Sequence, residues 1–268
     1  MVSRVAPCPW ESVSIRPASP AIPPNCLFSG DSRPSEPSSI QEGHYGDMTA
    51  LALFDLDNTL FDRQGAFERW ARAFVDGRKF PGDAYELLIR LDDDGFATRD
   101  AVFSGLRRAF HVDEPIASLI AGYRETYPKC FSPDADVQSA LRRLRELGWR
   151  TGVVTNGPAS QRQKLERAGL VELLDGWCIS DEVGAAKPDR QIFDEAVRRC
   201  SPAEGVDAVW MVGDTAEPDI AGGLSAGMRT VWMHRHRTWE VAGYRPDAQA
   251  GTIAEAVALL LDGPPLSV

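Results

Sequence analysis

The sequence of 268 residues predicts an α/β fold, a Rossmann-like parallel sheet into which an all-helical module is inserted. Two observations predict it. Short apolar runs of strand length alternate with segments of helical periodicity in the second half of the chain. The first two of these runs end near residue 55 and begin near residue 151, much farther apart than the roughly 30 residues of a βαβ unit require.

Each apolar run has the length and composition of a buried strand. The runs lie at residues 51–54, 151–154, 177–179, 209–212 and 230–233. The helical segments between and after them each end at a glycine or proline signal, and they lie at residues 137–147, 161–168, 191–200, 220–226 and 253–261. Strands that alternate with helices predict a parallel sheet covered on both faces.

The long connection after the first strand is itself helical in pattern. Its segments lie at residues 66–74, 84–91, 99–110 and 115–127. Thr98 or Asp100 can cap the third of these helices, and Asp113 the fourth. We therefore predict a helical module at 66–132, inserted into a core formed by 48–65 and 133–268.

The first 47 residues differ from the rest in composition. They hold eight of the 19 prolines and nine serines, without sustained apolar periodicity. Such a segment cannot bury enough surface to offset the entropy of ordering it, so 1–47 is expected to be a disordered extension. Its longest apolar run, residues 26–28, is too short for a secretory signal. A start codon assigned upstream of Met48 is an alternative explanation.

The overall charge excludes some functions. Lys and Arg number 29 against 39 Asp and Glu, a net charge of −10. A nucleic-acid or anionic-membrane partner would require basic clusters, and neither is expected. No apolar run approaches the length of a membrane span. The five cysteines form no C-x-x-C pair and are odd in number, which suits a reducing, cytoplasmic location.

Four polar clusters follow four of the predicted strands, at residues 55–59 (DLDNT), 155–157 (TNG), 184–189 (GAAKPD) and 213–219 (GDTAEPD). Ligands bind at the carboxyl ends of the strands in such sheets. Asp55 and Asp57 leave the first strand two residues apart and can face one pocket. Paired carboxylates of this kind can divide the roles of nucleophile and acid/base, or share a cation.

The other clusters suit phosphate and a metal ion. The hydroxyl of Thr155, the amide of Asn156 and the backbone of Gly157 can form an anion cradle. Lys187 can neutralise a phosphate as a point charge. Two further carboxylates come from 213–219, and hard oxygen ligands on few residues suit Mg²⁺.

The joint pattern resembles the haloacid dehalogenase-like (HAD) hydrolase superfamily, in the phosphatase branch with a C1-type helical cap. The signature of that family is DxDx[TV], then Ser or Thr, then Lys, then an acidic pair. The matching residues here are Asp55, Asp57, Thr59, Thr155, Lys187, Asp214 and Asp219. The resemblance covers about residues 51–235, and the helical module lies where the family places its cap.

The resemblance implies a Mg²⁺-dependent phosphomonoester hydrolase that acts on a small phosphorylated metabolite. Asp55 would attack phosphorus, and Asp57 would protonate the leaving oxygen and then activate water. Mg²⁺ would be held by Asp55, by the backbone carbonyl of Asp57 and by Asp214. The implied phosphate ligands are Thr155, Asn156, Gly157 and Lys187, with Thr59 and Asp219 in support.

Three alternatives stay open. A haloacid dehalogenase lacks an acid/base residue two positions after the nucleophile, so Asp57 argues against it. A sugar phosphomutase keeps both aspartates and is excluded less firmly. A non-catalytic binding module has no need of both carboxylates. No protein partner is implied by any motif.

For the other polar and aromatic residues near the expected site, a structural role is the first expectation. We expect Asp92–Gly95 to be a solvated loop between helices, with a place at the mouth of the site, favouring a cationic or hydroxyl-rich leaving group, as the alternative. Arg107 and Arg108 are expected on an exposed helix face, with a second anion site as the alternative. His234–His236 is expected to be a surface loop, with substrate contact as the alternative. Arg63 is a candidate for the hinge of the cap. Trp232 and Trp239 are expected to pack rather than to recognise a ligand.

Overall fold

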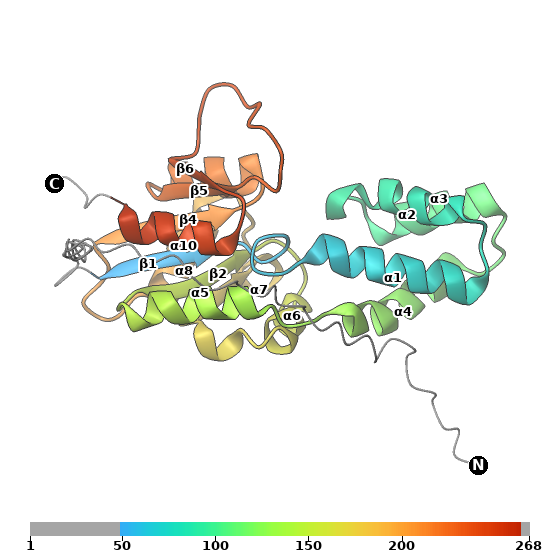
Figure 1. The fold of residues 1–268 in the computed structure, drawn as a ribbon, viewed down its shortest axis with the longest axis horizontal. Coiled ribbons are helices and arrows are strands. Elements are labelled where there is room, and N and C mark those ends of the chain that lie inside the picture. The colour runs from blue at the N-terminus through green and yellow to red at the C-terminus, as the bar shows by residue number, and fades with distance from the viewer. Residues whose placement is uncertain (1–48, 264–268) are drawn as a thin grey trace, which may run out of the picture. The chain divides into compact units, whose positions relative to one another are not determined.

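A computed structural model describes residues 49–263, and the predicted disordered extension 1–47 lies outside them. Six parallel strands form one sheet in the order β3-β2-β1-β4-β5-β6 (Figure 1). Their bounds are Ala50–Phe54 (β1), Arg150–Thr155 (β2), Gly176–Ile179 (β3), Ala208–Gly213 (β4), Arg229–Met233 (β5) and Ala248–Ala250 (β6). The predicted α/β fold is confirmed. β6 was not predicted, because three residues give no readable period.

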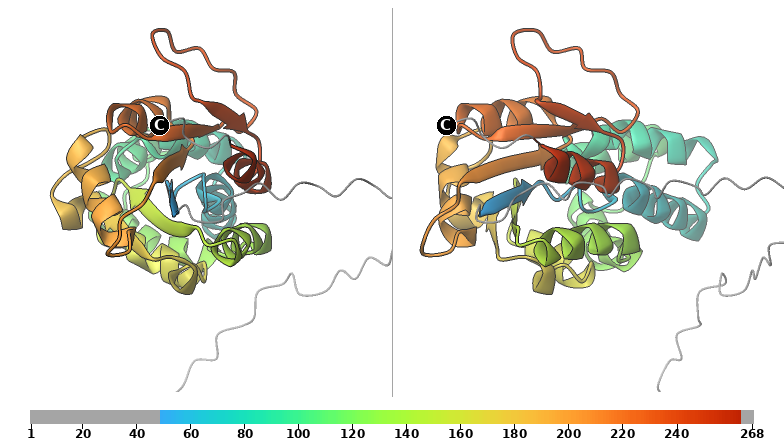
Figure 2. Two further views of the ribbon diagram at one scale, coloured as in Figure 1. Left: turned by 90° about the vertical axis from the view of Figure 1, so that its left-hand side faces the viewer. Right: turned by 60° about the vertical axis from the view of Figure 1, so that its left-hand side comes forward.

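Both faces of β1 are buried, as its unbroken apolar run predicts. Residues Ala50, Ala52 and Phe54 belong to one apolar cluster, whereas Leu51 and Leu53 belong to a second one on the opposite face. α5 (Ala135–Glu146) and α10 (Ile253–Asp262) pack together over the first face. α8 (Arg190–Cys200) covers the second face against β2 and β3, as Figure 2 shows.

Shorter helices follow the strands at the edge where the strands end. α6 (Gln161–Arg167) comes after β2, and α7 (Ser180–Val183) after β3. A π-helix, η4 (Ala216–Ala221), follows β4 and runs into α9 (Gly222–Ser225). The polar clusters of the sequence lie beside these helices: 155–157 comes before α6, 184–189 lies between α7 and α8, and 213–219 runs from the end of β4 into η4.

Four helices occupy the long connection between β1 and β2: α1 (Arg63–Arg78), α2 (Asp83–Asp92), α3 (Arg99–Phe110) and α4 (Ile116–Thr126). Each packs on the next, around an aromatic cluster, in which Phe67, Trp70, Phe74, Phe103 and Tyr123 contact one another. We propose that this four-helix module is the cap. Thr98 caps α3 by accepting from the N–H of Ala101, as predicted. The predicted cap at Asp113 was wrong, because α4 begins only after Pro115.

The module contains a buried ion cluster that the sequence did not predict. Asp92 is 1% exposed. It accepts hydrogen bonds from both terminal nitrogens of Arg63 and from Arg99, the latter at 2.7 Å. The expectation of a solvated loop at 92–95 was therefore wrong at Asp92. A carboxylate removed from water in this way needs its cationic partners, because an unpaired buried charge is costly.

The sequence predicts no membrane span and a reducing environment for the cysteines. Among residues 49–263, no helix combines the length and the apolar character needed to cross a bilayer. Cys178 and Cys200 are buried free thiols. The cytoplasmic location stays a prediction.

The ion cluster gives a stability prediction. Asp92→Asn keeps the shape of the side chain but leaves Arg63 and Arg99 without their carboxylate, so it should cost about 3 kcal/mol. The thermal midpoint should fall by roughly 2–4 °C per kcal/mol, measured by calorimetry. Asp93→Asn is the matched control, because Asp93 is exposed and Asn tolerates its left-handed backbone. Equal midpoints for both variants would contradict this reading.

Candidate active site

The four polar clusters meet at one cavity of about 320 Å³. Its lining includes predicted site residues from every cluster, namely Asp55, Asp57, Thr155, Asn156, Lys187 and Asp214. Residues of the helical module and its entry complete it, namely Arg63, Asp94, Gly95 and Phe96. Because parallel strands end at the same edge of the sheet, segments up to 160 residues apart in sequence deliver their side chains to one place.

Lys187 lies at the centre of the site and is 5% exposed. Its ammonium donates to Asp55 Oδ1 at 2.6 Å and to Asp219 Oδ1 at 2.7 Å. Burial alone would lower the pKa of Lys187, but the two carboxylates outweigh it and raise that pKa. The lysine is therefore a fixed positive charge beside the predicted nucleophile.

The loop after β4 is shaped by a close contact. A side chain on Gly213 would meet Asp219, because an ideal Cβ there lies 2.4 Å from the carboxyl carbon. Asp219 is fully buried and accepts from the N–H and the hydroxyl of Thr215, at 2.9 and 2.6 Å. It is thus held rigidly against Lys187, which agrees with its predicted supporting place.

Three carboxylates crowd together here. Asp55, Asp214 and Asp219 each offer one oxygen, and these oxygens lie within 4.8 Å of one another. Burial, together with Asp219 and Asp214, raises the pKa of Asp55 to about 8, although Lys187 opposes the shift. Burial and Asp219 raise the pKa of Asp214 to about 6 against the effect of Arg237 and Arg235. The neighbouring cations do not offset the burial of Asp55 and Asp214, whose pKa values stay raised, and a divalent cation with a preference for oxygen ligands fits this cluster.

The turn after β1 explains a residue choice in the sequence. Asn58 has φ of 64°, a left-handed conformation that Asn adopts more readily than most residues. Its side-chain oxygen accepts from the N–H of Gln64 at 2.9 Å. Thr59 is buried, and its hydroxyl has no hydrogen-bond partner among the described residues. Asp55 and Asp57 both come before Asn58 in the chain, and both line the cavity.

The three residues of the predicted anion cradle have different hydrogen-bond partners. Thr155 lines the cavity, and its hydroxyl accepts from the side chain of Gln161 at 2.9 Å. The side chain of Asn156 instead pairs with the backbone of Lys187, donating to its carbonyl at 2.9 Å and accepting from its N–H at 2.8 Å. The N–H of Gly157 donates to Ser180 Oγ at 2.9 Å. Asn156 therefore fixes the lysine loop, and Gly157 does not line the cavity.

Asp57 has partners that the sequence did not reveal. Lys164 donates to its two carboxylate oxygens at 2.6 and 2.7 Å, and Gln161 donates to Oδ2 at 3.0 Å. Burial would raise the pKa of Asp57, but the ammonium of Lys164 outweighs it and the pKa lies below its ordinary value. The signal available in the sequence was a Gln-x-x-Lys spacing on the helix after Thr-Asn-Gly, which places both side chains on one face.

The segment after β5 also reaches the site, so the expected surface loop at His234–His236 was wrong at Arg235. This arginine donates to Asp214 Oδ2 at 3.1 Å and to Asp94 Oδ2 at 2.9 Å. Arg237 adds a contact to Asp214 Oδ2 at 3.2 Å. Trp232 is buried as predicted, and its indole N–H donates to the carbonyl of Asp214 at 2.9 Å. These contacts hold both the carboxylate and the backbone carbonyl of Asp214 in place.

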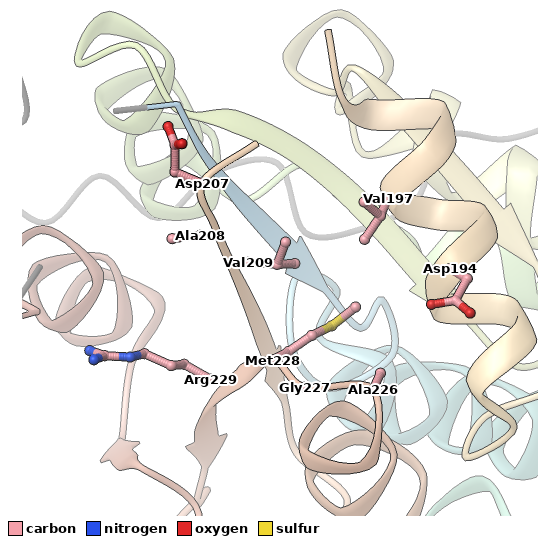
Figure 3. Close-up of a pocket in the computed structure, with 9 residues that line it drawn as sticks. All are labelled: Asp194, Val197, Asp207, Ala208, Val209, Ala226, Gly227, Met228 and Arg229. Atoms are coloured by element: carbon pink, nitrogen blue, oxygen red, sulfur yellow. The ribbon is translucent and has the colours of Figure 1, made fainter. Parts of the chain in front are cut away.

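A second cavity of about 320 Å³ lies at the opposite edge, where β4 and β5 begin (Figure 3). It is lined by the start of these strands and by Asp194 and Val197 of α8. Its described lining contains Asp207 and Arg229 but no lysine or hydroxyl side chain. The chemistry of the four clusters is therefore confined to the first cavity.

Comparison with known proteins agrees with this geometry. The sequence profile of the haloacid dehalogenase-like hydrolases matches residues 49–227, most of the chain. The chain belongs to the haloacid dehalogenase-like hydrolase family, and the predicted resemblance is confirmed.

Individual relatives bear names of phosphatases. The chain is 30% identical over 203 residues to a glyceraldehyde 3-phosphate phosphatase of Methanothermobacter thermautotrophicus, covering 71% of this chain and 88% of that enzyme. It is 41% identical over 112 residues to the pyrimidine 5'-nucleotidase YjjG of Escherichia coli, and this match spans about half of YjjG (49%) and 41% of this chain. The HAD-hydrolase YfnB of Bacillus subtilis, solved with bound magnesium, superposes with a TM-score of 0.64 at 25% identity, covering 80% of this chain and 99% of YfnB.

The crowding of carboxylates predicts an unusual pH dependence of stability. The raised pKa of Asp55 means that the folded protein keeps a proton that the unfolded chain releases above about pH 4. Stability without metal should therefore fall as the pH rises from 5 to 8. In chelator at pH 7.5, Asp55→Asn should raise the thermal midpoint by at least the 2–4 °C that about 1 kcal/mol produces.

Added Mg²⁺ should raise the midpoint of the wild type more than that of Asp55→Asn. Asp76→Asn, at an exposed position on α1, serves as the control. A lower midpoint for metal-free Asp55→Asn than for the wild type would show that the carboxylate stabilises the fold without a cation.

Proposed function

We propose that this protein is a Mg²⁺-dependent phosphomonoester hydrolase that acts on a small phosphorylated metabolite through an aspartyl-phosphate. One observation carries the proposal. Two carboxylates from one turn, Asp55 and Asp57, line the same cavity but have different partners. Asp55 lies against Lys187 beside two further carboxylates, and Asp57 lies against Lys164. Carboxylates in two different surroundings can take two different roles. Bound Mg²⁺ would keep the Asp55 carboxylate ionised against the raised pKa that it has in the metal-free site.

In the first step, an oxygen of Asp55 attacks phosphorus in line. The bond from phosphorus to the leaving oxygen breaks, and its electron pair stays on that oxygen. Lys187 stands beside the attacking carboxylate and neutralises the phosphoryl oxygens, while the hydroxyl of Thr155 donates to them. Asp55, the Asp57 carbonyl and Asp214 would hold Mg²⁺, which supplies the positive charge that lets a dianionic phosphate approach a carboxylate.

Asp57 acts in both halves of the reaction. The cycle begins with Asp57 protonated, and this proton passes to the leaving oxygen. The ion pair with Lys164 corresponds to the carboxylate form of Asp57, which then takes a proton from the water that attacks the aspartyl-phosphate. The second attack breaks the bond between Asp55 and phosphorus and releases phosphate. The two residues are thus regenerated together at the end of each cycle.

The names of the relatives support a small substrate. One is a phosphatase of glyceraldehyde 3-phosphate and another a pyrimidine 5'-nucleotidase. Glyceraldehyde 3-phosphate and a pyrimidine nucleotide differ widely in the leaving group, so the proposal names the phosphoryl chemistry and not the metabolite. A dehalogenase is disfavoured by the presence of Asp57, and a phosphomutase would return a phosphorylated product in place of free phosphate.

Activity measurements test the proposal. The wild type should hydrolyse p-nitrophenyl phosphate with Mg²⁺ and lose this activity in chelator. Asp55→Asn should abolish turnover, because an amide is not a nucleophile, and Asp57→Asn should cost about 10²–10⁴-fold in kcat. The loss for Asp57→Asn should be larger with alkyl phosphates, whose leaving oxygen needs the proton more.

Circular dichroism serves as the control for folding of both variants. Turnover by Asp55→Asn at a rate near that of the wild type would assign the nucleophile elsewhere, and release of a phosphorylated isomer would favour the mutase.

A further inference from the structure

The site contains a second lysine besides Lys187. Lys164 projects from α6, and 13% of its side chain is exposed. Its ammonium contacts both oxygens of the Asp57 carboxylate and lies 5.7 Å from the ring centre of Phe61. A surface ion pair between two mobile side chains contributes little. Here one ammonium binds both oxygens of a carboxylate that is itself 28% exposed, so the plane of that carboxylate is fixed.

A second donor on the same helix completes the arrangement. Gln161 is 3% exposed, and its side-chain nitrogen donates to Asp57 Oδ2 at 3.0 Å and to Thr155 Oγ1 at 2.9 Å. Gln161 packs closely against Gly157, because a Cβ atom on residue 157 would lie only 3.1 Å from the Gln161 side chain. α6 therefore connects the acid/base carboxylate to a phosphate-binding hydroxyl through fixed contacts.

We propose that Lys164 is a positioning residue for Asp57 and acts chiefly in hydrolysis of the aspartyl-phosphate; this inference rests on the proposed function. In that step the water oxygen bonds to phosphorus, the Asp55–phosphorus bond breaks with its electrons on Asp55, and the water proton passes to Asp57. Lys164 remains an ammonium throughout. Asp57 must lie within about 2.6–3.2 Å of the water, and a displacement of 1 Å can cost about 10²-fold.

Aryl phosphates separate the two steps. p-Nitrophenolate leaves without needing a proton, so the first step tolerates a misplaced Asp57 while the second does not. Lys164→Met should therefore lower kcat for p-nitrophenyl phosphate by roughly 10–100-fold, with KM unchanged or lower. The fraction of enzyme trapped as phosphoenzyme on acid quench should rise. Lys164→Arg, which can also bind both oxygens, should recover most of kcat.

Arg162→Gln is the matched control on the same helix. The Arg162 side chain is half exposed and pairs with Glu182, so this variant should behave as the wild type. Lys164→Gln provides a second neutral variant if the methionine variant does not fold, with thermal midpoints measured for all. Wild-type kcat in the neutral variants, a loss confined to KM, or an arginine variant no better than methionine would overturn the inference.

Failure of the proposed function gives a different result. In that case the wild type itself shows no Mg²⁺-dependent hydrolysis, or Asp55→Asn keeps its activity. With an active wild type and an inactive Asp55→Asn, the behaviour of the Lys164 variants decides the inference alone.

Discussion

The ammonium of Lys187 is shared by two buried carboxylates, and the rest of the site depends on this sharing. Asp55 and Asp219 hold the lysine from two strand ends, and Asn156 fixes its backbone from a third. Burial raises the pKa of Asp55 to about 8, and the neighbouring carboxylates of Asp219 and Asp214 add to a shift that Lys187 opposes only in part. The fold thus brings three buried carboxylates together, a cluster that could hold a divalent cation. Stability and activity are opposed at these residues, as is common at catalytic centres.

The hydrogen-bond partners of Asp57 differ from those of Asp55. Asp57 lies only two residues from Asp55, yet its charge is already balanced by Lys164. One turn therefore presents an acid whose lysine is shared with a second buried carboxylate and an acid that has its own lysine. We propose that this asymmetry gives chemically equal side chains separate roles. Arg235 adds a contact from Asp214 to Asp94 in the helical module, so the loop after β4 and the lining of the cavity are connected.

Much of this could be predicted from the sequence, for a physical reason. A strand buried on both faces is visible as an apolar run, and the residues that follow such runs meet at one edge of a parallel sheet. Asp55, Thr155, Lys187 and Asp214 could therefore be assigned together. The position of α3 was readable as well, because its cap at Thr98 is a local interaction.

The features that were missed depend on contacts between distant segments. Asp92 is buried only because Arg63 and Arg99 converge on it from two different helices. Lys164 pairs with Asp57, which lies 107 positions earlier in the chain, and the residue spacing within α6 does not indicate this partner. A local pattern shows which face a side chain occupies, but not what the fold places opposite that face.

The central claim is that Asp55 carries the phosphoryl group during the reaction. The most direct measurement uses Asp57→Asn, in which hydrolysis of the intermediate should be slow. This variant is mixed with p-nitrophenyl phosphate and Mg²⁺, quenched in acid and analysed by peptide mass spectrometry. We expect one added phosphoryl group on the peptide that contains Asp55, at the Asp55 side chain. Release of p-nitrophenol without any phosphorylated peptide, or a phosphoryl group on another residue, would contradict it.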